Sequence, residues 1–239
     1  MRRTVRELQS SLRSSLWEMT PRDHHQEDRD FRRRRIVSAI VVVVGACVLG
    51  YSLNIKDDPT RFGLFALLLA VVWAVGALTS GPLHLGRLGV PAEPDLIAPR
   101  PVMPPILLGV GLALVFVAGA FVIREIPWLD AQVENVLRHA QEGSAWLLLA
   151  VTVVNGIAEE LFFRGAMYAA IKEHQVAWTT LAYTVATLAT GNVMLGFAAI
   201  VLGVVVGLQR RATGGILAPI LTHLVWSVAM LFALPAILL

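Results

Sequence analysis

The chain has 239 residues, of which 56% are hydrophobic and 15% are charged, and its formal net charge is +3. A soluble domain carries about a quarter charged residues, and a soluble protein with a mean hydropathy of +0.67 would expose large apolar patches and aggregate. Composition therefore excludes a soluble globular protein, a disordered chain and, because Cys47 is the one cysteine, a disulfide scaffold, and it predicts a polytopic membrane protein.

The first 35 residues form a highly charged segment. Residues 1–35 hold ten of the twenty basic residues, together with six acidic residues. Such a segment is too charged to enter a bilayer, and we expect a cytoplasmic Arg-rich tail. Val5, Leu8, Leu12 and Leu16 recur at helical spacing, which favours a short helix on an anionic lipid surface, with a solvated tail as the alternative. Because the acidic residues offset much of the charge, no nucleic-acid partner is expected.

Long apolar segments follow the tail. A membrane-spanning helix needs about 20 mostly apolar residues. The candidates are Ile36–Leu53, Phe62–Ser80, Ile106–Ile123, Ser144–Lys172, Val176–Thr190, Val193–Leu208 and Ile216–Leu234. Gly81–Pro105 is predicted to be a loop and residues 124–144 an amphipathic interfacial helix and loop. The expected fold class is all-α, a polytopic transmembrane helical bundle of about seven spans, with N-terminal helices and loops in residues 36–143 and the C-terminal helices in 144–239.

The positive-inside rule orients these segments. When successive spans alternate in direction, the basic residues fall on one side of the membrane. They belong to the tail, to the loop before the third span, to Lys172 and to Arg210 and Arg211. We therefore expect a multi-pass protein of the cell membrane, surrounded by the lipid bilayer, with a cytoplasmic N-terminus.

Three charged residues, Glu159, Glu160 and Arg164, lie in the middle of the fourth apolar segment. Each such charge costs roughly 2.5–3.5 kcal/mol at the centre of a membrane helix. Glu160 and Arg164 have the spacing of a helical ion pair, whereas Glu159 points about 100° away on an α-helix. We therefore expect Arg164 to neutralise Glu160 and leave Glu159 available as a general base or acid. A purely structural ion-pair network, or a position at the cytoplasmic rim, is the alternative.

A second polar pair lies on the last apolar segment. His223 and Ser227 are four residues apart and share one face of a helix. On its own, a histidine in a membrane helix is readily explained as a hydrogen-bonding group between helices, with no chemical role. Together with the charged segment, however, it has a chemical use, because a carboxylate and an imidazole from two helices can flank one buried water. We expect Glu159 and His223 to form such a pair.

These residues resemble the CPBP family of intramembrane proteases, the CAAX-prenyl-protease-related, Abi-type membrane proteins. Residues 159–164 match its EExxxR motif, and residues 214–223, GGILAPILTH, are similar to the segment that ends on its membrane histidine. The similarity covers about residues 146–234. It implies a helical bundle with a cavity open to membrane and cytosol, and hydrolysis of a peptide bond near the terminus of a membrane-anchored protein or peptide substrate.

The resemblance also implies roles for single residues. Glu159 would be the base that activates water, and His223 with Ser227, which stands where an Asn is usual, would stabilise the oxyanion. The family has been called a metalloprotease, and Glu159 and His223 would then be zinc ligands, with Glu160 as a third if Arg164 released it. A metal-free glutamate mechanism is easier to build from these residues.

One family motif is missing. The histidine of the motif FxxxH is absent, and its expected position falls at Ala189, Thr190 or Asn192. Asn192 would then substitute for it, or the protein would be a pseudoenzyme. The alternatives to a peptidase are a non-catalytic membrane scaffold or immunity protein of the same fold and, less favoured because no inverted repeat is visible, a small proton-coupled transporter.

Overall fold

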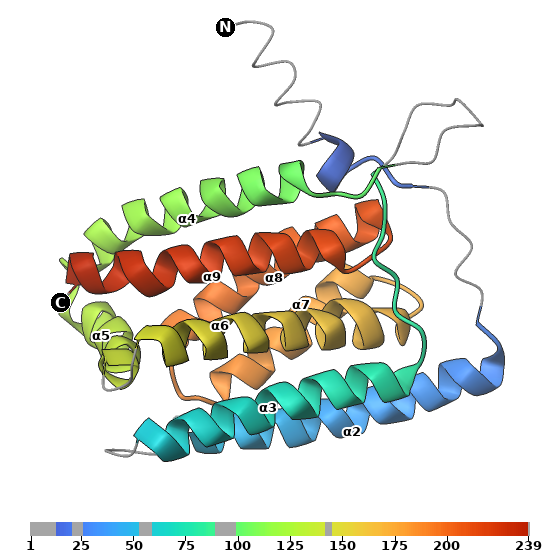
Figure 1. Cartoon of the computed structure of the whole chain (residues 1–239), viewed down its shortest axis with the longest axis horizontal. Coiled ribbons are helices and arrows are strands. Elements are labelled where there is room, and N and C mark those ends of the chain that lie inside the picture. The colour runs from blue at the N-terminus through green and yellow to red at the C-terminus, as the bar shows by residue number, and fades with distance from the viewer. Residues whose placement is uncertain (1–12, 21–25, 53–58, 89–98, 142–144, 239) are drawn as a thin grey trace, which may run out of the picture.

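Helices make up every regular element of the described residues, which are 13–20, 26–52, 59–88, 99–141 and 145–238 of a computed structural model (Figure 1). The elements are α2 (Asp28–Ser52), α3 (Pro59–Ser80), α4 (Met103–Ile123), α5 (Pro127–Gln141), α6 (Ala145–Glu159), the π-helix η1 (Glu160–Met167), α7 (Gln175–Leu188), α8 (Val193–Thr213) and α9 (Leu217–Leu238). This confirms the predicted all-α bundle. Val5, Leu8 and Leu12 of the predicted surface helix lie outside the described residues.

Six helical segments are long and apolar enough to cross a membrane. They are Asp28–Ser52, Gly63–Ser80, Met103–Ile123, Ala145–Met167, Val193–Thr213 and Leu217–Leu238. The remaining predicted span corresponds to α7, whose 14 residues extend over only about 21 Å, less than the roughly 30 Å of a bilayer core. The structure therefore contains six full-length candidates and one short helix where the sequence predicted about seven spans.

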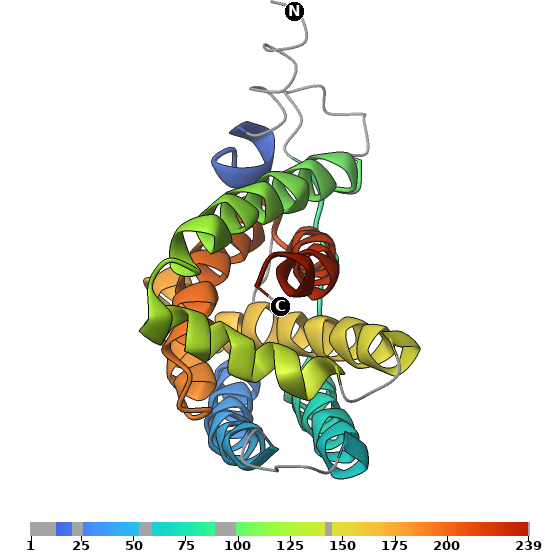
Figure 2. The same cartoon turned by 90° about the vertical axis from the view of Figure 1, so that its left-hand side faces the viewer.

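The last helix, α9, lies between three others. It packs mainly against α4, α6 and α8, and Figure 2 shows it end-on with α4 above it and α6 below it. The helices α2 and α3 form a hairpin that packs on α6, η1 and α7. The amphipathic α5 crosses one end of the bundle, where an interfacial helix was predicted (Figure 2). This arrangement places α6 and η1 between the hairpin and α9.

Two glycines let α7 and α8 approach closely. A Cβ atom on Gly203 would lie 2.9 Å from Cγ2 of Thr180, and one on Gly207 would lie 2.9 Å from Cγ1 of Val176. Real Cβ atoms do not approach other atoms so closely, so a side chain at either position would push the helices apart. The resulting contact fixes the position of α7 relative to the centre of the bundle.

Aromatic side chains form the core between α3, η1 and α7. Trp73 stacks on Phe162 with ring centroids 4.8 Å apart and touches Phe163 at 5.0 Å. Phe163 in turn lies 5.0 Å from the ring of Tyr183. These rings are buried, and they hold the charged segment of η1 against α7.

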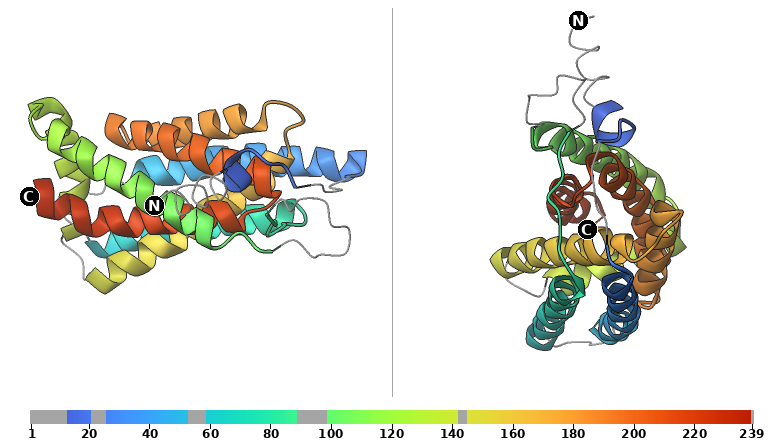
Figure 3. Two further views of the ribbon diagram at one scale, coloured as in Figure 1. Left: turned by 90° about the horizontal axis from the view of Figure 1, so that it is seen from above. Right: turned by 90° about the vertical axis from the view of Figure 1, so that its right-hand side faces the viewer.

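Basic side chains make contacts at the end of the bundle opposite α5, the end that lies away from α5 in the left view of Figure 3. Arg34 donates to the carbonyl oxygen of Pro82 at 3.1 Å, and Arg100 donates to that of Gly86 at 2.8 Å. The segment that contains Gly86 crosses the α8–α9 turn, where a Cβ atom on Gly215 would overlap the backbone of Gly86. The basic residues of separate loops thus gather at one end, as the alternation of spans predicted.

Candidate active site

The charged segment is a π-helix rather than a continuation of the α-helix. Residues Glu160–Met167 form η1 directly after Glu159, where the sequence predicted one unbroken α-helix to Lys172. A π-helix frees backbone carbonyl groups from the regular α-helical ladder, and such segments are frequent at functional sites. Here Nε of Arg210, a buried residue of α8, donates to the carbonyl oxygen of Arg164 at 2.6 Å. Packing against α8 therefore stabilises the irregular helix.

Glu160 bridges the side chains of Arg164 and His223 in the bundle interior. Its Oε1 accepts a hydrogen bond from Nη1 of Arg164 at 3.1 Å and lies 2.8 Å from Nδ1 of His223. The side chains of Glu160 and Arg164 are both fully buried, at 0% exposure. The expected pair of Glu160 and Arg164 is thus present in the structure. Glu160 also makes a direct contact with His223 that the sequence did not predict, whereas the expected pair of Glu159 and His223 was one that flanks a water molecule.

His223 keeps one ring nitrogen free of this bridge. Its Nδ1 faces Glu160, so Nε2 points elsewhere, toward α6. A Cβ atom on Gly156 would lie 3.9 Å from that Nε2, in ordinary contact. A longer side chain at position 156 would fill the space beside the imidazole. The glycine one turn before the carboxylates therefore leaves room at the reactive edge of the ring.

Glu159 has a neutral partner instead of a cationic one. Its Oε2 accepts a hydrogen bond from the hydroxyl group of Tyr183 on α7 at 2.8 Å, and its side chain is half-buried. Glu159 also interacts electrostatically with His223 and Arg164. The Tyr183 ring lies 4.8 Å from the Arg164 guanidinium carbon, so the same side chain contacts both charged groups. We call Glu159, Glu160, Arg164, Tyr183 and His223 the interior cluster.

Tyr183 and Arg210 were missed by the sequence analysis. Tyr183 is the one tyrosine in the apolar segment 176–190, and a phenol group in such a segment usually needs a hydrogen-bond partner. That signal was available in the sequence. Arg210 was counted only as part of a basic loop, and nothing in its sequence neighbourhood points to a buried contact with η1.

Asn192 does not join the interior cluster. Its Oδ1 accepts from the backbone N–H groups of Met194 and Leu195 at 3.0 and 3.1 Å, and its Nδ2 donates to the carbonyl oxygen of Gln132 on α5 at 2.6 Å. Asn is among the best residues for capping the start of a helix. The contacts of Asn192 are therefore those of the α8 N-cap and of the end of the bundle that α5 covers.

Ser227 follows His223 by about one turn of α9 and is half-buried. Its hydroxyl group has no hydrogen-bond partner among the described residues, so it is available to another group. Ser227 thus lies on the same face of α9 as His223, as the sequence predicted, but its hydroxyl group makes no hydrogen bond to a described residue.

The described residues do not fit a zinc ion with three protein ligands. No group of three or more His, Cys, Asp or Glu side chains that could hold a metal occurs in the described ranges. Two of the predicted zinc ligands, Glu160 and His223, are hydrogen-bonded to each other. Arg164 donates a hydrogen bond to the same carboxylate oxygen of Glu160. A catalytic zinc site usually has three protein ligands and an open position.

The interior cluster has spare hydrogen-bonding capacity. Oε2 of Glu160, Nε and Nη2 of Arg164 and the hydroxyl group of Thr184 are buried and have no partner among the described residues. Buried polar groups of this kind are usually satisfied by ordered water. Each of these atoms can therefore bond to ordered water inside the bundle.

Comparison with known families supports the resemblance over the C-terminal part of the chain. Residues 141–229 match the family model described as "Type II CAAX prenyl endopeptidase Rce1-like". No curated protein and no solved structure matches the chain significantly. The matched region runs from the end of α5 into α9 and contains the whole interior cluster. Over this region, about 37% of its length, the chain is similar to the CAAX-type membrane proteases that it resembles by its motifs.

Proposed function

We propose that this protein is an intramembrane endopeptidase that hydrolyses a peptide bond of a membrane-associated protein with a water molecule activated by Glu159. The observation that carries the proposal is the bridge of Glu160 between Arg164 and His223. It joins the two polar segments that were separate in the sequence and leaves Glu159 without a cation on its carboxylate oxygens.

The proposed reaction divides the work between the two carboxylates. Glu159 removes a proton from water as the resulting hydroxide attacks the carbonyl carbon of the scissile bond, and it later returns the proton to the leaving amine. Tyr183 orients Glu159 through its hydroxyl group. In this proposal Glu159 is the catalytic residue and Tyr183 a positioning residue.

Glu160 and His223 act on the developing oxyanion. In the imidazolium form both nitrogens of His223 donate, Nδ1 to Glu160 and Nε2 to the substrate oxygen. Glu160 stabilises that form, and Arg164 holds Glu160 in place. The Ser227 hydroxyl group, on the same face of α9, supplies a second and weaker donor. Donors fixed in a water-poor interior stabilise such charge strongly.

The basic end of the bundle is proposed to face the cytoplasm, because positively charged loops stay on that side. Thr20 lies at this end, where its hydroxyl group donates to the carbonyl oxygen of Arg87 at 2.8 Å. A Thr20→Cys variant in a Cys47→Ser background should be labelled by an impermeant thiol reagent only after the cells are opened. Labelling of intact cells would contradict this orientation.

A non-catalytic relative of the same fold is the second candidate. The observation that favours it is Asn192, which stands near the expected position of the missing histidine and whose amide is used for a helix cap and a contact with α5. In that case the interior cluster would only hold α6, α7 and α9 together.

The two candidates are separated by an activity assay. The purified full-length protein in nanodiscs is incubated with a library of membrane-anchored peptides, and products are identified by mass spectrometry for the wild type beside Glu159→Gln. A peptidase cleaves at least one library member, and Glu159→Gln abolishes that cleavage. Cleavage that persists in Glu159→Gln would contradict the proposed base, and a wild type that cleaves nothing would favour the non-catalytic candidate.

A further inference from the structure

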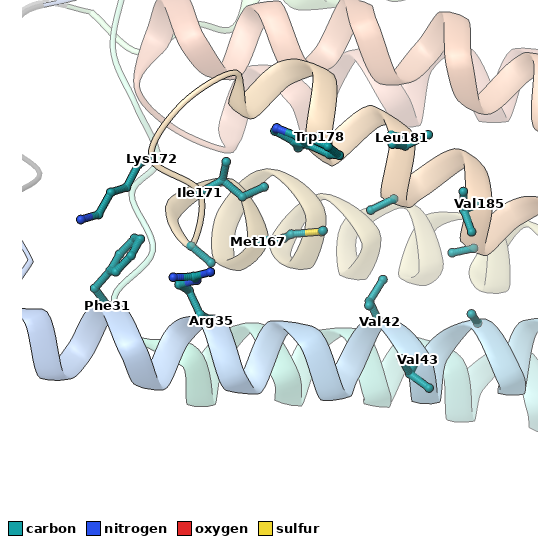
Figure 4. Close-up of a pocket in the computed structure, with 14 residues that line it drawn as sticks. Phe31, Arg35, Val42, Val43, Met167, Ile171, Lys172, Trp178, Leu181 and Val185 are labelled. Atoms are coloured by element: carbon teal, nitrogen blue, oxygen red, sulfur yellow. The ribbon is translucent and has the colours of Figure 1, made fainter.

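An apolar groove runs between α2 and α7 on the outside of the bundle (Figure 4). Its volume is about 660 Å³. The α2 wall includes Val42, Val43 and Ala46, the α7 wall includes Trp178 and Leu181, and η1 supplies Met167. Val43 and Trp178 are exposed at 62% and 55%, so the groove opens to whatever surrounds the helices. In a membrane these surroundings are acyl chains.

Two cations stand at one end of this groove. Figure 4 shows Arg35, Lys172 and Phe31 together at that end, away from Val43. Nζ of Lys172 lies 5.1 Å from the centre of the Phe31 ring, and the Arg35 guanidinium carbon lies 5.8 Å from the same centre. No carboxylate in the described part of the chain pairs with either cation, and both side chains are exposed. The end of the groove therefore carries two exposed positive charges, and no carboxylate is among the residues that line the groove itself.

The cationic end continues into a second, more polar pocket. This pocket has a volume of about 520 Å³ and shares Phe31, Ile171 and Lys172 with the groove. The buried Arg34 also lines it. Beyond the two cations of the groove, this pocket adds Arg34 and Arg210, together with one carboxylate, that of Asp28, at the basic end of the bundle. Lipid headgroups lie at such an end next to a membrane protein.

From these observations we infer that the groove binds one anionic phospholipid, with an acyl chain between α2 and α7 and the headgroup phosphate at Arg35 and Lys172. An acyl chain suits the apolar walls, and a phosphate supplies the missing counter-charge. A zwitterionic lipid carries its own cation and gains less from these residues. The inference goes beyond the proposed peptidase, because neither pocket is lined by a residue of the interior cluster.

The headgroup contact is tested by lipid binding to the purified full-length protein. The protein in detergent is titrated with phosphatidylglycerol or with phosphatidylcholine of the same chains, and native mass spectrometry measures the retained lipid. We expect preferential retention of phosphatidylglycerol and an about 30-fold weaker affinity in Arg35→Gln/Lys172→Gln, the effect of removing two basic side chains from an anionic lipid surface. The matched control, Arg32→Gln/Arg33→Gln, removes two exposed charges from the same end of α2 outside the groove and should change the affinity little.

The acyl-chain contact is tested by filling the groove. Ala46→Phe should reduce phosphatidylglycerol retention at least tenfold, whereas Cys47→Phe, at the exposed neighbouring position outside the groove, should not. Unfolding midpoints of all variants are recorded, so that a loss of binding is counted only for folded protein.

Three results would overturn the inference. The first is equal retention of phosphatidylglycerol and phosphatidylcholine, and the second is an equal loss of phosphatidylglycerol affinity in the two double variants. The third is displacement of phosphatidylglycerol by an isoprenylated peptide at a lower concentration than by added phosphatidylglycerol. The last result would assign the groove to a substrate. None of these measurements depends on proteolysis, so a failure here and a failure of the proposed peptidase are distinguishable.

Discussion

The interior cluster and the α2–α7 groove each contain two basic side chains, but only the interior cluster supplies their counter-charge. Arg164 and His223 converge on one carboxylate oxygen of Glu160 inside the bundle. Arg35 and Lys172 stand on the surface around Phe31 and meet no carboxylate of the described residues. A charge buried away from water must find its partner within the protein, whereas a charge at the membrane rim can find it in a lipid.

The difference between the two regions predicts whether a substitution lowers the stability of the fold or the affinity for a ligand. Removing Glu160 or Arg164 from the interior cluster leaves a buried partner uncompensated, so stability should fall. Removing a charge from the rim of the groove leaves the fold intact, and the affinity for an anionic ligand should fall.

Arg164→Ala should destabilise the fold by about 3–5 kcal/mol, because it leaves Glu160 buried without its guanidinium partner. The control is Arg124→Ala, which removes the exposed pair of Arg124 and Glu125, with side chains 47% and 72% exposed. Exposed pairs contribute about 0–1 kcal/mol. Unfolding followed by circular dichroism in detergent compares the two. Equal losses would mean that burial of the pair does not matter.

His223→Ala should reduce peptide cleavage by about 10²–10³-fold, the effect of losing one oxyanion donor. Ser227→Ala should cost less, because a hydroxyl group is a weaker and more mobile donor. Ser227→Asn should raise the rate, since it restores the residue usual in the family. Rates are compared per folded molecule. An unchanged rate in His223→Ala would remove His223 from the proposed reaction.

Tyr183→Phe should destabilise the fold by about 1.5–3 kcal/mol, because Glu159 then loses a hydrogen bond to a charged group. The ring remains and keeps its contact with Arg164. Tyr51→Phe, at a side chain that is 60% exposed, is the control and should change little. If both variants unfold at the same temperature as the wild type, the Tyr183 hydroxyl group does not hold Glu159.

Gly203→Ala should destabilise the fold by about 1–3 kcal/mol, because the new Cβ atom overpacks the contact with Thr180. Gly119→Ala meets no atom within 4 Å and should be neutral or slightly stabilising, since Ala favours helices. The comparison is made by thermal unfolding. A stabilised Gly203→Ala would show that α7 and α8 are not in close contact.

Much of the fold followed from local patterns. Hydropathy located the spans, the amphipathic pattern located α5, and the spacing of Glu160 and Arg164 predicted their pair. These features depend on residues close in the chain. Composition did not decide whether α7 spans the membrane. Its apolar segment ends near Thr190 by composition, and the helix ends at Leu188 by hydrogen bonding.

The details of the site depended on packing between distant helices. The partner of His223 was expected to be Glu159, but the π-helical turn and the position of α9 bring Glu160 to the ring. The hydrogen bond between Tyr183 and Glu159 likewise requires α7 to lie beside η1. No spacing within one helix specifies such contacts, so neither the direct contact of Glu160 with His223 nor that of Tyr183 with Glu159 could be predicted from the sequence.

We propose that the two adjacent carboxylates have different tasks, and the unfolding midpoints of Glu159→Gln and Glu160→Gln distinguish these tasks. Glutamine keeps the shape of either side chain and its oxygen can still accept the Tyr183 hydroxyl group. Glu159→Gln should therefore unfold at nearly the wild-type temperature. Glu160→Gln should unfold well below it, because Arg164 and His223 lose their shared anion. Equal losses in the two variants would contradict this division between a catalytic and a structural glutamate.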